Sequence, residues 1–189
     1  MELFNFIGGE FVASVSGKTF SKYSPFDNSE LAQVADSDAM DVITSLQVSK
    51  KAFAAFEPVT LEQRAGYLNA LADHFEKKAS EIAYQEALHQ GLPKSFVLKN
   101  SVEVAIQILR DNAKSVIQPL PEGVLTQAAG IVGIITSWSL SLRLVTERLA
   151  PALAAGNAVI VKVSEHSPIT AKVLGEACKA AQIPMGMVQ

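Results

Sequence analysis

The sequence predicts an α/β protein, in which a small antiparallel β-ribbon and a layer of antiparallel helices precede an incomplete parallel sheet. Two runs, at 130–136 and 158–163, are apolar on both faces, which is typical of parallel strands that helices cover on both sides. The stretch between them is long enough for a helical crossover. Upstream, short β-prone runs give way to helical spacing at Ser37. We therefore divide the chain into a β-ribbon over 1–36, a helical layer over 37–118 and a βαβ unit over 129–189.

The β-ribbon is predicted from four short β-prone runs. The first two lie on either side of Gly8 and Gly9, a pair that accepts the positive φ angles of a tight hairpin turn. A third run at 18–25 ends in a proline, and a fourth at 30–35 follows a turn. We expect these runs to form a small antiparallel meander.

The first helix of the helical layer is expected to begin near Ser37 or Asp38, because either side chain can cap a helix. It is expected to end near Pro58. Its apolar positions at helical spacing are Val42, Leu46, Phe53 and Phe56.

Three antiparallel helices are expected next. Thr60 and Gln63 fit a capping box that begins the first of them, and a second over 79–88 ends at Gly91. The third is a long amphipathic helix whose apolar stripe is Leu98, Val102, Ala105, Leu109 and Ala113. A linker over 117–127 follows, because its two prolines disfavour helix.

The βαβ unit is predicted from the order strand, helix, strand. A helix over 140–149 lies between the two strands, and a second helix begins at Ser167 and Pro168, which stand in the favoured order of cap and proline. The last residues, 186–189, are consistent with the start of a third parallel strand.

The composition excludes several classes of function. Charged residues make up 19% of the chain and the formal net charge is -3, so no basic surface is available for nucleic acid. One cysteine and three dispersed histidines give neither a disulfide framework nor the spacing of a metal site. No apolar run approaches the roughly 20 residues of a membrane helix, and the N-terminus has no signal-peptide pattern. We expect a cytoplasmic protein that binds no nucleic acid, membrane or metal.

Polar loops follow both predicted strands. The carboxyl ends of parallel strands meet at one edge of a sheet, so these loops are expected to lie side by side. The Lys162 ammonium can donate to a ribose diol and the Glu165 carboxylate can accept from it, while the helix that starts at Ser167 adds a partial positive charge. A solvated ion pair on an exposed loop explains the same residues. The candidate residues are Thr136, Ser137, Trp138 and Ser139 in the first loop and Lys162, Ser164 and Glu165 in the second.

The strings PALAAGNAVIVKVSEHSPITA, GIVGIITSW, FIGGEFV and EALHQGLP together resemble the N-terminal part of the NAD(P)-dependent aldehyde dehydrogenases, and the resemblance covers essentially the whole chain. It implies one partial coenzyme-binding domain over 1–189 with a Rossmann-like, incomplete parallel sheet. It also implies that Lys162 and Glu165 hold the adenosine ribose of NAD or NADP. The loop that contains Thr136, Ser137 and Trp138 would approach the other end of the cofactor.

The chain departs from the family pattern in three respects. Ser139 occupies the position of the family's oxyanion-binding Asn, and the loss of one such donor costs on the order of 10² to 10³ in rate. Charged residues, Arg143, Glu147 and Arg148, follow where the family has an apolar substrate tunnel. The family's nucleophilic Cys and general-base Glu have no counterpart in these 189 residues. We therefore expect no catalytic residue in this chain.

Other nucleophiles are weak candidates. Cys178 lies on the apolar stripe of a helix, where cysteines are mostly buried and unreactive. Ser137, Ser139 and Ser141 cluster near His166, but no G-x-S-x-G elbow is present, so we expect His166 to be a surface side chain. The remaining histidines, His74 and His89, are expected to be solvated positions on helices.

Three interpretations follow. The first is a truncated aldehyde dehydrogenase homologue, a pseudoenzyme with weak or lost NAD(P) binding. Two charge-assisted hydrogen bonds of about 1.5 to 3 kcal/mol each oppose an association cost of at least about 4 kcal/mol, which predicts millimolar affinity at best. The second is an interaction or oligomerisation module that forms a homodimer or larger homo-oligomer through an exposed sheet edge. The third is the N-terminal half of a split enzyme, active only with a complementary C-terminal half that carries the Cys.

Overall fold

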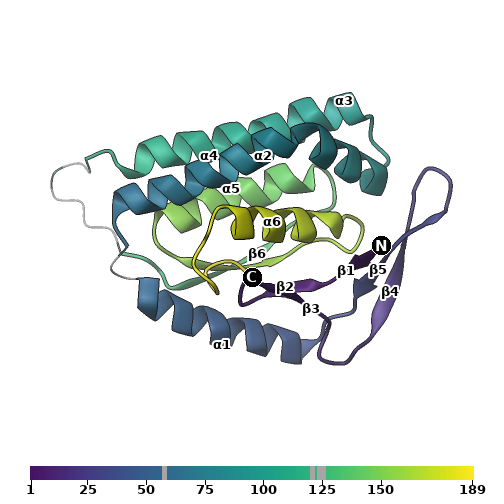
Figure 1. The fold of residues 1–189 in the computed structure, drawn as a ribbon, viewed down its shortest axis with the longest axis horizontal. Coiled ribbons are helices and arrows are strands. Elements are labelled where there is room, and N and C mark those ends of the chain that lie inside the picture. The colour runs from purple at the N-terminus through teal and green to yellow at the C-terminus, as the bar shows by residue number, and fades with distance from the viewer. Residues whose placement is uncertain (57–58, 120–121, 123–126) are drawn as a thin grey trace.

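The structure is a computed structural model that describes residues 1–56, 59–119, 122 and 127–189 (Figure 1). A parallel sheet of β6 (Ile131–Ile135) and β7 (Ala158–Lys162) lies between α1 (Ala39–Phe56) on one face and α5 (Ser141–Ala154) on the other. The helices α2 (Leu61–Gln90) and α4 (Glu103–Val116) form a further layer, which packs on α5. The α/β class predicted from the sequence is confirmed.

The N-terminal strands form two small sheets rather than one meander. The predicted hairpin is present as β2 (Asn5–Ile7) and β3 (Glu10–Val12), with Gly8 and Gly9 at φ angles of 64° and 85°. The strands β4 (Thr19–Tyr23) and β5 (Glu30–Ala35) pair antiparallel in a separate sheet. There β1 (Glu2–Leu3) pairs parallel with β5, and the ammonium of Met1 donates to Leu31 O at 3.0 Å. The single meander was wrong because the chain breaks its pairing at Phe4, so that β1 and β2 belong to different sheets.

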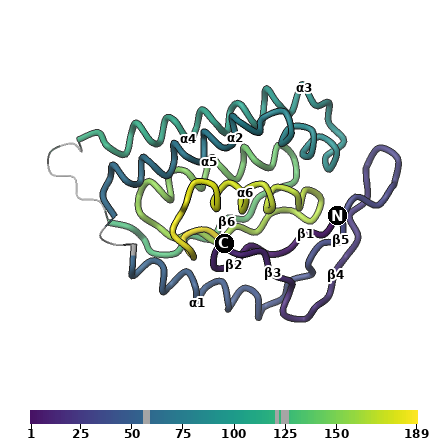
Figure 2. The backbone as a smooth tube through the Cα atoms, in the orientation of Figure 1, coloured from purple at the N-terminus to yellow at the C-terminus, as the bar shows by residue number. Residues whose placement is uncertain are grey.

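The hairpin is fixed against α6 (Ile169–Ala180) by two aromatic rings. The rings of Phe6 and Phe11 lie 5.2 Å apart between centroids. A Cβ added at Gly175 of α6 would lie 2.8 Å from atoms of both rings, so only glycine permits this approach without a shift. Figure 2 shows the C-terminus beside β2, and the Gly8 N–H donates to Gln189 Oε1 at 2.7 Å.

Helix α1 buries its polar side. Asp38 Oδ1 accepts from the Met40 N–H at 2.7 Å, which agrees with the predicted cap.

The prediction that Val42 and Leu46 mark the core face was wrong, since they are 52% and 42% exposed. The buried positions are Asp41, Ser45 and Ser49. Two of them bind backbone groups of other segments: Asp41 Oδ1 accepts from the Val15 N–H at 2.9 Å and Ser49 donates to Gly186 O at 3.1 Å. Ser45 donates to Asp41 O within the helix at 2.9 Å. The expected end at Pro58 lies outside the described residues, as does the Phe56 side chain.

Helix α2 is a single helix, although two helices were predicted from the sequence over these residues. Its capping box is confirmed, with Thr60 Oγ1 accepting from the Gln63 N–H at 3.2 Å and Gln63 Oε1 accepting from the Thr60 N–H at 3.0 Å. No glycine or proline interrupts 67–90, so the helix continues through Ala79. It ends at Gly91, whose φ of 72° is left-handed.

The antiparallel partner of α2 is built from three consecutive pieces, α3 (Lys94–Val97), the π-helix η1 (Leu98–Val102) and α4. The predicted stripe is buried at Val102, Ala105, Leu109 and Ala113, while Leu98 is half-buried. Two long antiparallel helices therefore replace the three that were expected. Most of the predicted linker over 117–127 lies outside the described residues, which include only 117–119, 122 and 127 of it.

The predicted βαβ unit is confirmed. β6 and β7 pair in parallel from Ile131↔Ala158 to Ile135↔Lys162, and Val188 forms a parallel bridge to Val159, where a third strand was expected to start. Helix α5 runs through Pro151 to Ala154. The expectation of full cover on both faces fails at Ile135, which is 79% exposed.

Helix α6 does not begin as expected. Pro168, not Ser167, stands at its N-cap position, and no side chain caps it. The Ser167 hydroxyl is buried and instead accepts from Gln90 Nε2 at 3.2 Å.

Candidate functional site

The two predicted loops leave the same edge of the sheet. Ile135 and Lys162 are the last register pair, and the Thr136 N–H donates to Lys162 O at 3.3 Å. The loops 136–140 and 163–168 therefore lie side by side, as the order of the parallel strands predicted.

Lys162 and Glu165 form an ion pair in the second loop. Lys162 Nζ lies 3.4 Å from Glu165 Oε2, and the two side chains are 64% and 58% exposed. The pKa of the Glu165 carboxyl lies below its ordinary value, first because its own backbone N–H donates to it and then because Lys162 does. The pair thus presents an ionised acceptor and an ammonium donor to solvent. An ion pair this exposed contributes little to stability, so its geometry is compatible both with ligand binding and with simple solvation.

A cavity of about 480 Å³ adjoins this ion pair. Lys162, Ser164 and Glu165 line its edge, and side chains such as Phe6 and Leu174 make its wall largely apolar. Its size is within the range of ligand pockets, roughly 300 to 1,000 Å³. The cavity joins the second loop to the N-terminal strands, α1 and α6, and the predicted residues of the first loop are not among those that line it.

The side chains of the first loop differ in their exposure to solvent. Ser137 and Trp138 are exposed and Ser139 is half-buried. Thr136 is buried, and its hydroxyl has no hydrogen-bond partner among the described residues. Beyond the loop, Arg143 and Glu147 pair at 2.7 Å and Arg148 approaches Glu147 at 3.6 Å. This face of α5 is therefore charged, as the sequence suggested.

Two side chains of α2 that the sequence analysis did not single out contact this region. Gln90 Oε1 accepts from the Leu140 N–H at 2.9 Å, and Glu86 Oε1 accepts from the Leu142 N–H at 2.8 Å. A signal was present in the sequence, because Glu86 continues the apolar stripe of Leu71, Phe75 and Ile82, where a polar residue needs a specific partner.

The other possible catalytic groups do not come together in the site. Cys178 is buried, and burial raises the pKa of its thiol to about 12. His166 is exposed and lies 3.9 Å from Glu165 Oε1. Ser141 is buried at the start of α5.

The expectation of solvated helix histidines was wrong for His89, which is 2% exposed. Neither of its ring nitrogens has a hydrogen-bond partner among the described residues. Burial lowers the pKa of the imidazole to about 4, and the positive charges of Lys22 and the N-terminus add to the effect. The cause is packing of the N-terminal sheet on the end of α2, where Pro25 lies against Gly91. His74 is half-buried, and burial lowers its pKa as well.

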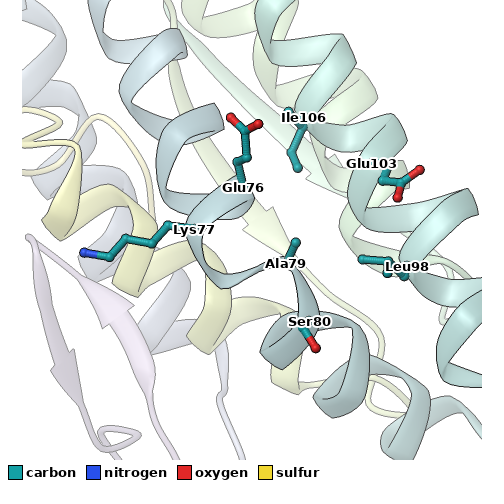
Figure 3. A pocket seen from close by; sticks show the side chains of 7 residues that line it. All are labelled: Glu76, Lys77, Ala79, Ser80, Leu98, Glu103 and Ile106. Carbon is teal, nitrogen blue, oxygen red and sulfur yellow. The ribbon is translucent and has the colours of Figure 1, made fainter.

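A second cavity, of about 500 Å³, lies in the helical layer rather than at the candidate site (Figure 3). Its lining residues are Glu76, Lys77, Ala79, Ser80, Leu98, Glu103 and Ile106. Figure 3 shows the Lys77 side chain extending away from the other labelled residues, so its charge does not face Glu103. None of the predicted site residues contributes to this cavity.

Within the described ranges, no helix is both long enough and apolar enough to cross a membrane. The same residues contain no cluster of three or more His, Cys, Asp or Glu side chains that could hold a metal ion.

Comparison with known proteins gives a consistent result. The sequence model described as "Aldehyde dehydrogenase family" matches residues 11–189. A mitochondrial aldehyde dehydrogenase of Leishmania tarentolae is 33% identical over 96% of this chain and 39% of its own length. A 2-hydroxymuconic semialdehyde dehydrogenase of Pseudomonas sp. (strain CF600) is 31% identical over 98% of this chain and 41% of its own length.

A solved structure supports the same fold. The NAD+ complex of an aldehyde dehydrogenase from Bacillus cereus superposes with a TM-score of 0.96 at 27% identity, and covers 100% of this chain and 41% of its own. The chain thus spans about two fifths of the length of the relatives that it matches.

Proposed function

The chain belongs to the aldehyde dehydrogenase family, and we propose that its 189 residues bind NAD or NADP weakly through Lys162 and Glu165 but do not oxidise aldehydes by themselves. The observation that carries this proposal is the ion pair at the edge of the parallel sheet, beside a largely apolar cavity of about 480 Å³.

The chemistry of the pair suits a ribose diol. The Lys162 ammonium donates to one hydroxyl and the ionised Glu165 accepts from another. An apolar cavity next to the pair offers a surface for a planar base. A nicotinamide cofactor, when bound, would supply the hydride acceptor, while this chain holds the ribose and places Trp138 and the buried Thr136 hydroxyl on the adjoining loop.

The proposed affinity is millimolar. Both side chains are more than half exposed, so each hydrogen bond competes with water. A dissociation constant of 1 mM corresponds to about 4 kcal/mol of binding free energy, whereas two such bonds leave about 2 kcal/mol at most after an association cost of at least about 4 kcal/mol. Apolar contact of the base with the cavity is expected to supply the remainder, so we propose no affinity tighter than millimolar.

The absence of aldehyde oxidation is proposed because no nucleophile is available. Cys178 is the chain's one cysteine, and its thiol is buried with a pKa of about 12. Loss of a covalent nucleophile typically lowers kcat on the order of 10⁶-fold. Ser139, half-buried in the first loop, lacks the amide that would donate to an oxyanion.

Calorimetric titration with NAD+ and with NADP+ tests the binding site. The wild-type chain is expected to bind one of them with a millimolar dissociation constant, and Lys162→Ala is expected to abolish detectable binding. Lys78→Ala is the matched control, because Lys78 also pairs with an acidic residue three positions on, at 2.7 Å, on an exposed helix surface. Equal binding by wild type and Lys162→Ala, no binding by wild type, or micromolar binding would each contradict the proposal.

A second candidate function is that of one half of a split aldehyde dehydrogenase. The supporting observation is the segment 187–189, which runs beside β7: Val188 forms a parallel bridge to Val159, and Gln189 O accepts from the Val161 N–H at 2.8 Å. Within the described ranges, no strand pairs with the other side of this segment. Mixing this chain with a separately expressed C-terminal part of a relative is expected to give NADH formation from an aldehyde. Each part alone is expected to give none, and activity of this chain alone would contradict both proposals.

A homodimer or larger homo-oligomer corresponds to the function of an interaction module that pairs through a sheet edge. Its supporting observation lies at the opposite edge of the sheet, where Ile135 of β6 is 79% exposed. We also infer a cytoplasmic location, which a single buried cysteine favours over an oxidising compartment.

A further inference from the structure

We propose that Gln90 and Glu86, in the last turns of α2, are positioning residues that fix the two cofactor loops relative to one another by capping α5 from outside. This inference rests on the proposed function, since it concerns how the nucleotide-binding loops are held in place.

Helix α5 has no cap of its own. Its N-cap residue is Leu140, which has no side-chain oxygen and adopts a left-handed φ of 49°. Leucine rarely adopts this conformation, and an uncapped helix start leaves several N–H groups unpaired. The first loop therefore enters α5 in a geometry that its own sequence does not favour.

Other elements supply the missing acceptors. Gln90 Oε1 accepts from the Leu140 N–H at 2.9 Å and Glu86 Oε1 accepts from the Leu142 N–H at 2.8 Å. The next N–H, of Arg143, donates to Ser101 Oγ at 3.3 Å. Ser101 lies in the π-helix η1, a local widening that is often found at functional positions in helices. Three side chains from two elements thus replace one local cap.

The same Gln90 side chain also holds the second loop. Its Nε2 donates to Ser167 Oγ at 3.2 Å and to Glu86 Oε1 at 2.8 Å. Ser167 is joined to Ser164 of the ribose-binding loop, because its N–H donates to Ser164 O at 3.0 Å. One amide therefore connects the loop that contains Trp138 with the loop that contains Lys162 and Glu165.

Water cannot readily replace these contacts. Glu86, Gln90, Ser101 and Ser167 are all buried. A buried donor or acceptor that loses its partner retains the full desolvation penalty, so removal of the amide is expected to move the loops rather than leave them in place. The carboxyl of Glu86 also lies at the N-terminus of α5, where the partial positive charge of the helix dipole favours an acceptor.

Trp138 provides a direct readout, since it is the chain's one tryptophan and lies two residues before Leu140. We expect Gln90→Leu to raise the rate of acrylamide quenching of Trp138 about twofold, because the loop loses its buried anchor. The far-UV circular dichroism is expected to stay that of wild type.

The control is Thr146→Val. Thr146 is also buried in α5, but its hydroxyl donates to Leu142 O within the same helix and contacts neither loop. Its quenching is expected to equal that of wild type. An equal change in Thr146→Val and Gln90→Leu would show that any loss of a buried hydrogen bond in this layer has the same effect, which would overturn the proposal.

An exchange of the two residues makes the test specific. Gln90→Glu alone places two carboxyl groups in contact and is expected to raise quenching. In the double variant Glu86→Gln/Gln90→Glu, a rotation of the amide at 86 lets its nitrogen donate to the carboxyl at 90 while its oxygen accepts from the Leu142 N–H. The carboxyl at 90 still accepts from the Leu140 N–H and can accept from the Ser167 hydroxyl. It is expected to return quenching to the wild-type value. If Gln90→Leu does not fold, this pair still decides: a double variant that behaves like Gln90→Glu overturns the proposal.

Nucleotide titration of the same variants separates this inference from the proposed function. If wild type binds NAD+ and the fluorescence results hold, Gln90→Leu is expected to weaken binding and the double variant to restore it. If wild type does not bind NAD+, the proposed function fails, while the quenching results still support or overturn the link between the loops.

Discussion

His89 and Glu86 are two titratable side chains that the fold has removed from water. His89 lies at the end of α2 beneath the N-terminal sheet, and Glu86 lies one turn earlier against the start of α5. Burial disfavours the charged form of each, so it lowers the pKa of the histidine and raises that of the carboxyl. The two residues therefore give stability opposite dependences on pH.

His89 predicts a loss of stability in acid. Its pKa is about 4 in the folded chain, below the ordinary 6.5, so the stability that depends on neutral His89 is present above pH 6.5 and is lost as the pH falls toward 4. The loss is on the order of 3 kcal/mol. Urea unfolding between pH 7 and pH 4 is expected to show this slope in wild type and a smaller one in His89→Leu. Thr146→Val, which alters a buried side chain that does not titrate, is the control and is expected to keep the wild-type slope.

Glu86 predicts the opposite trend. Because its pKa is raised in the folded chain, its contribution is fully present below the ordinary value of 4.5 and is lost as the pH rises through the folded value. Relative to Glu86→Gln, the wild-type chain is expected to lose unfolding free energy as the pH rises from 4.5 to 8. Parallel pH profiles of the two proteins in urea unfolding would contradict this prediction.

Among the elements, those that local chemistry specifies were predicted well. The capping box at Thr60, the left-handed Gly91 and the hairpin turn at Gly8 and Gly9 all depend on residues within a few positions of one another. The division of α2 into two helices overlooked a local feature, the absence of glycine and proline over 67–90, while other errors concern tertiary context. Helix α1 buries its polar side because backbone groups of distant segments need polar partners there. The hydrophobic periodicity of α1 does not predict this orientation.

Because α6 packs closely on the hairpin, adding one methyl group at Gly175 is expected to lower the free energy of unfolding. Gly175→Ala places Cβ within 2.8 Å of the rings of Phe6 and Phe11, and it is expected to destabilise the chain by about 1 to 3 kcal/mol. Gly66→Ala in α2 is the matched control. No atom lies within 4 Å of its added Cβ, so it is expected to be neutral or to stabilise by up to about 1 kcal/mol. Thermal unfolding of both variants checks the prediction, and equal midpoints would contradict it.

At the scale of the whole molecule, the sequence predicted where the candidate site lies but not what holds it. Parallel strands bring their carboxyl ends together, so the proximity of the two loops followed from topology alone. The cavity beside Lys162 depends on the N-terminal strands and α1, and the anchor at Gln90 depends on α2. Contacts between elements so far apart in the sequence leave no local sequence pattern from which they could be predicted.

The sheet edge formed by β6, which among the described residues pairs only with β7, predicts self-association. Light scattering after size exclusion is expected to give a mass above that of one chain at micromolar concentration, because exposed apolar edges favour pairing. Ile135→Asp, at the exposed end of β6, is expected to shift the mass toward that of a monomer. Phe26→Asp, at an even more exposed position in the turn before β5, is the control and is expected to leave the mass unchanged. A monomeric wild type would contradict the prediction.

The external cap of α5 also constrains the order of folding. Its acceptors Gln90, Glu86 and Ser101 stand 50, 56 and 42 residues before the N–H groups that they bind. This helix therefore cannot acquire a stable start until α2 and η1 have packed against it. Loop closure over such a separation precedes any gain from the contact. Helix α5, which connects β6 to β7, should therefore become stable late in folding, after α2 and α4 have packed together.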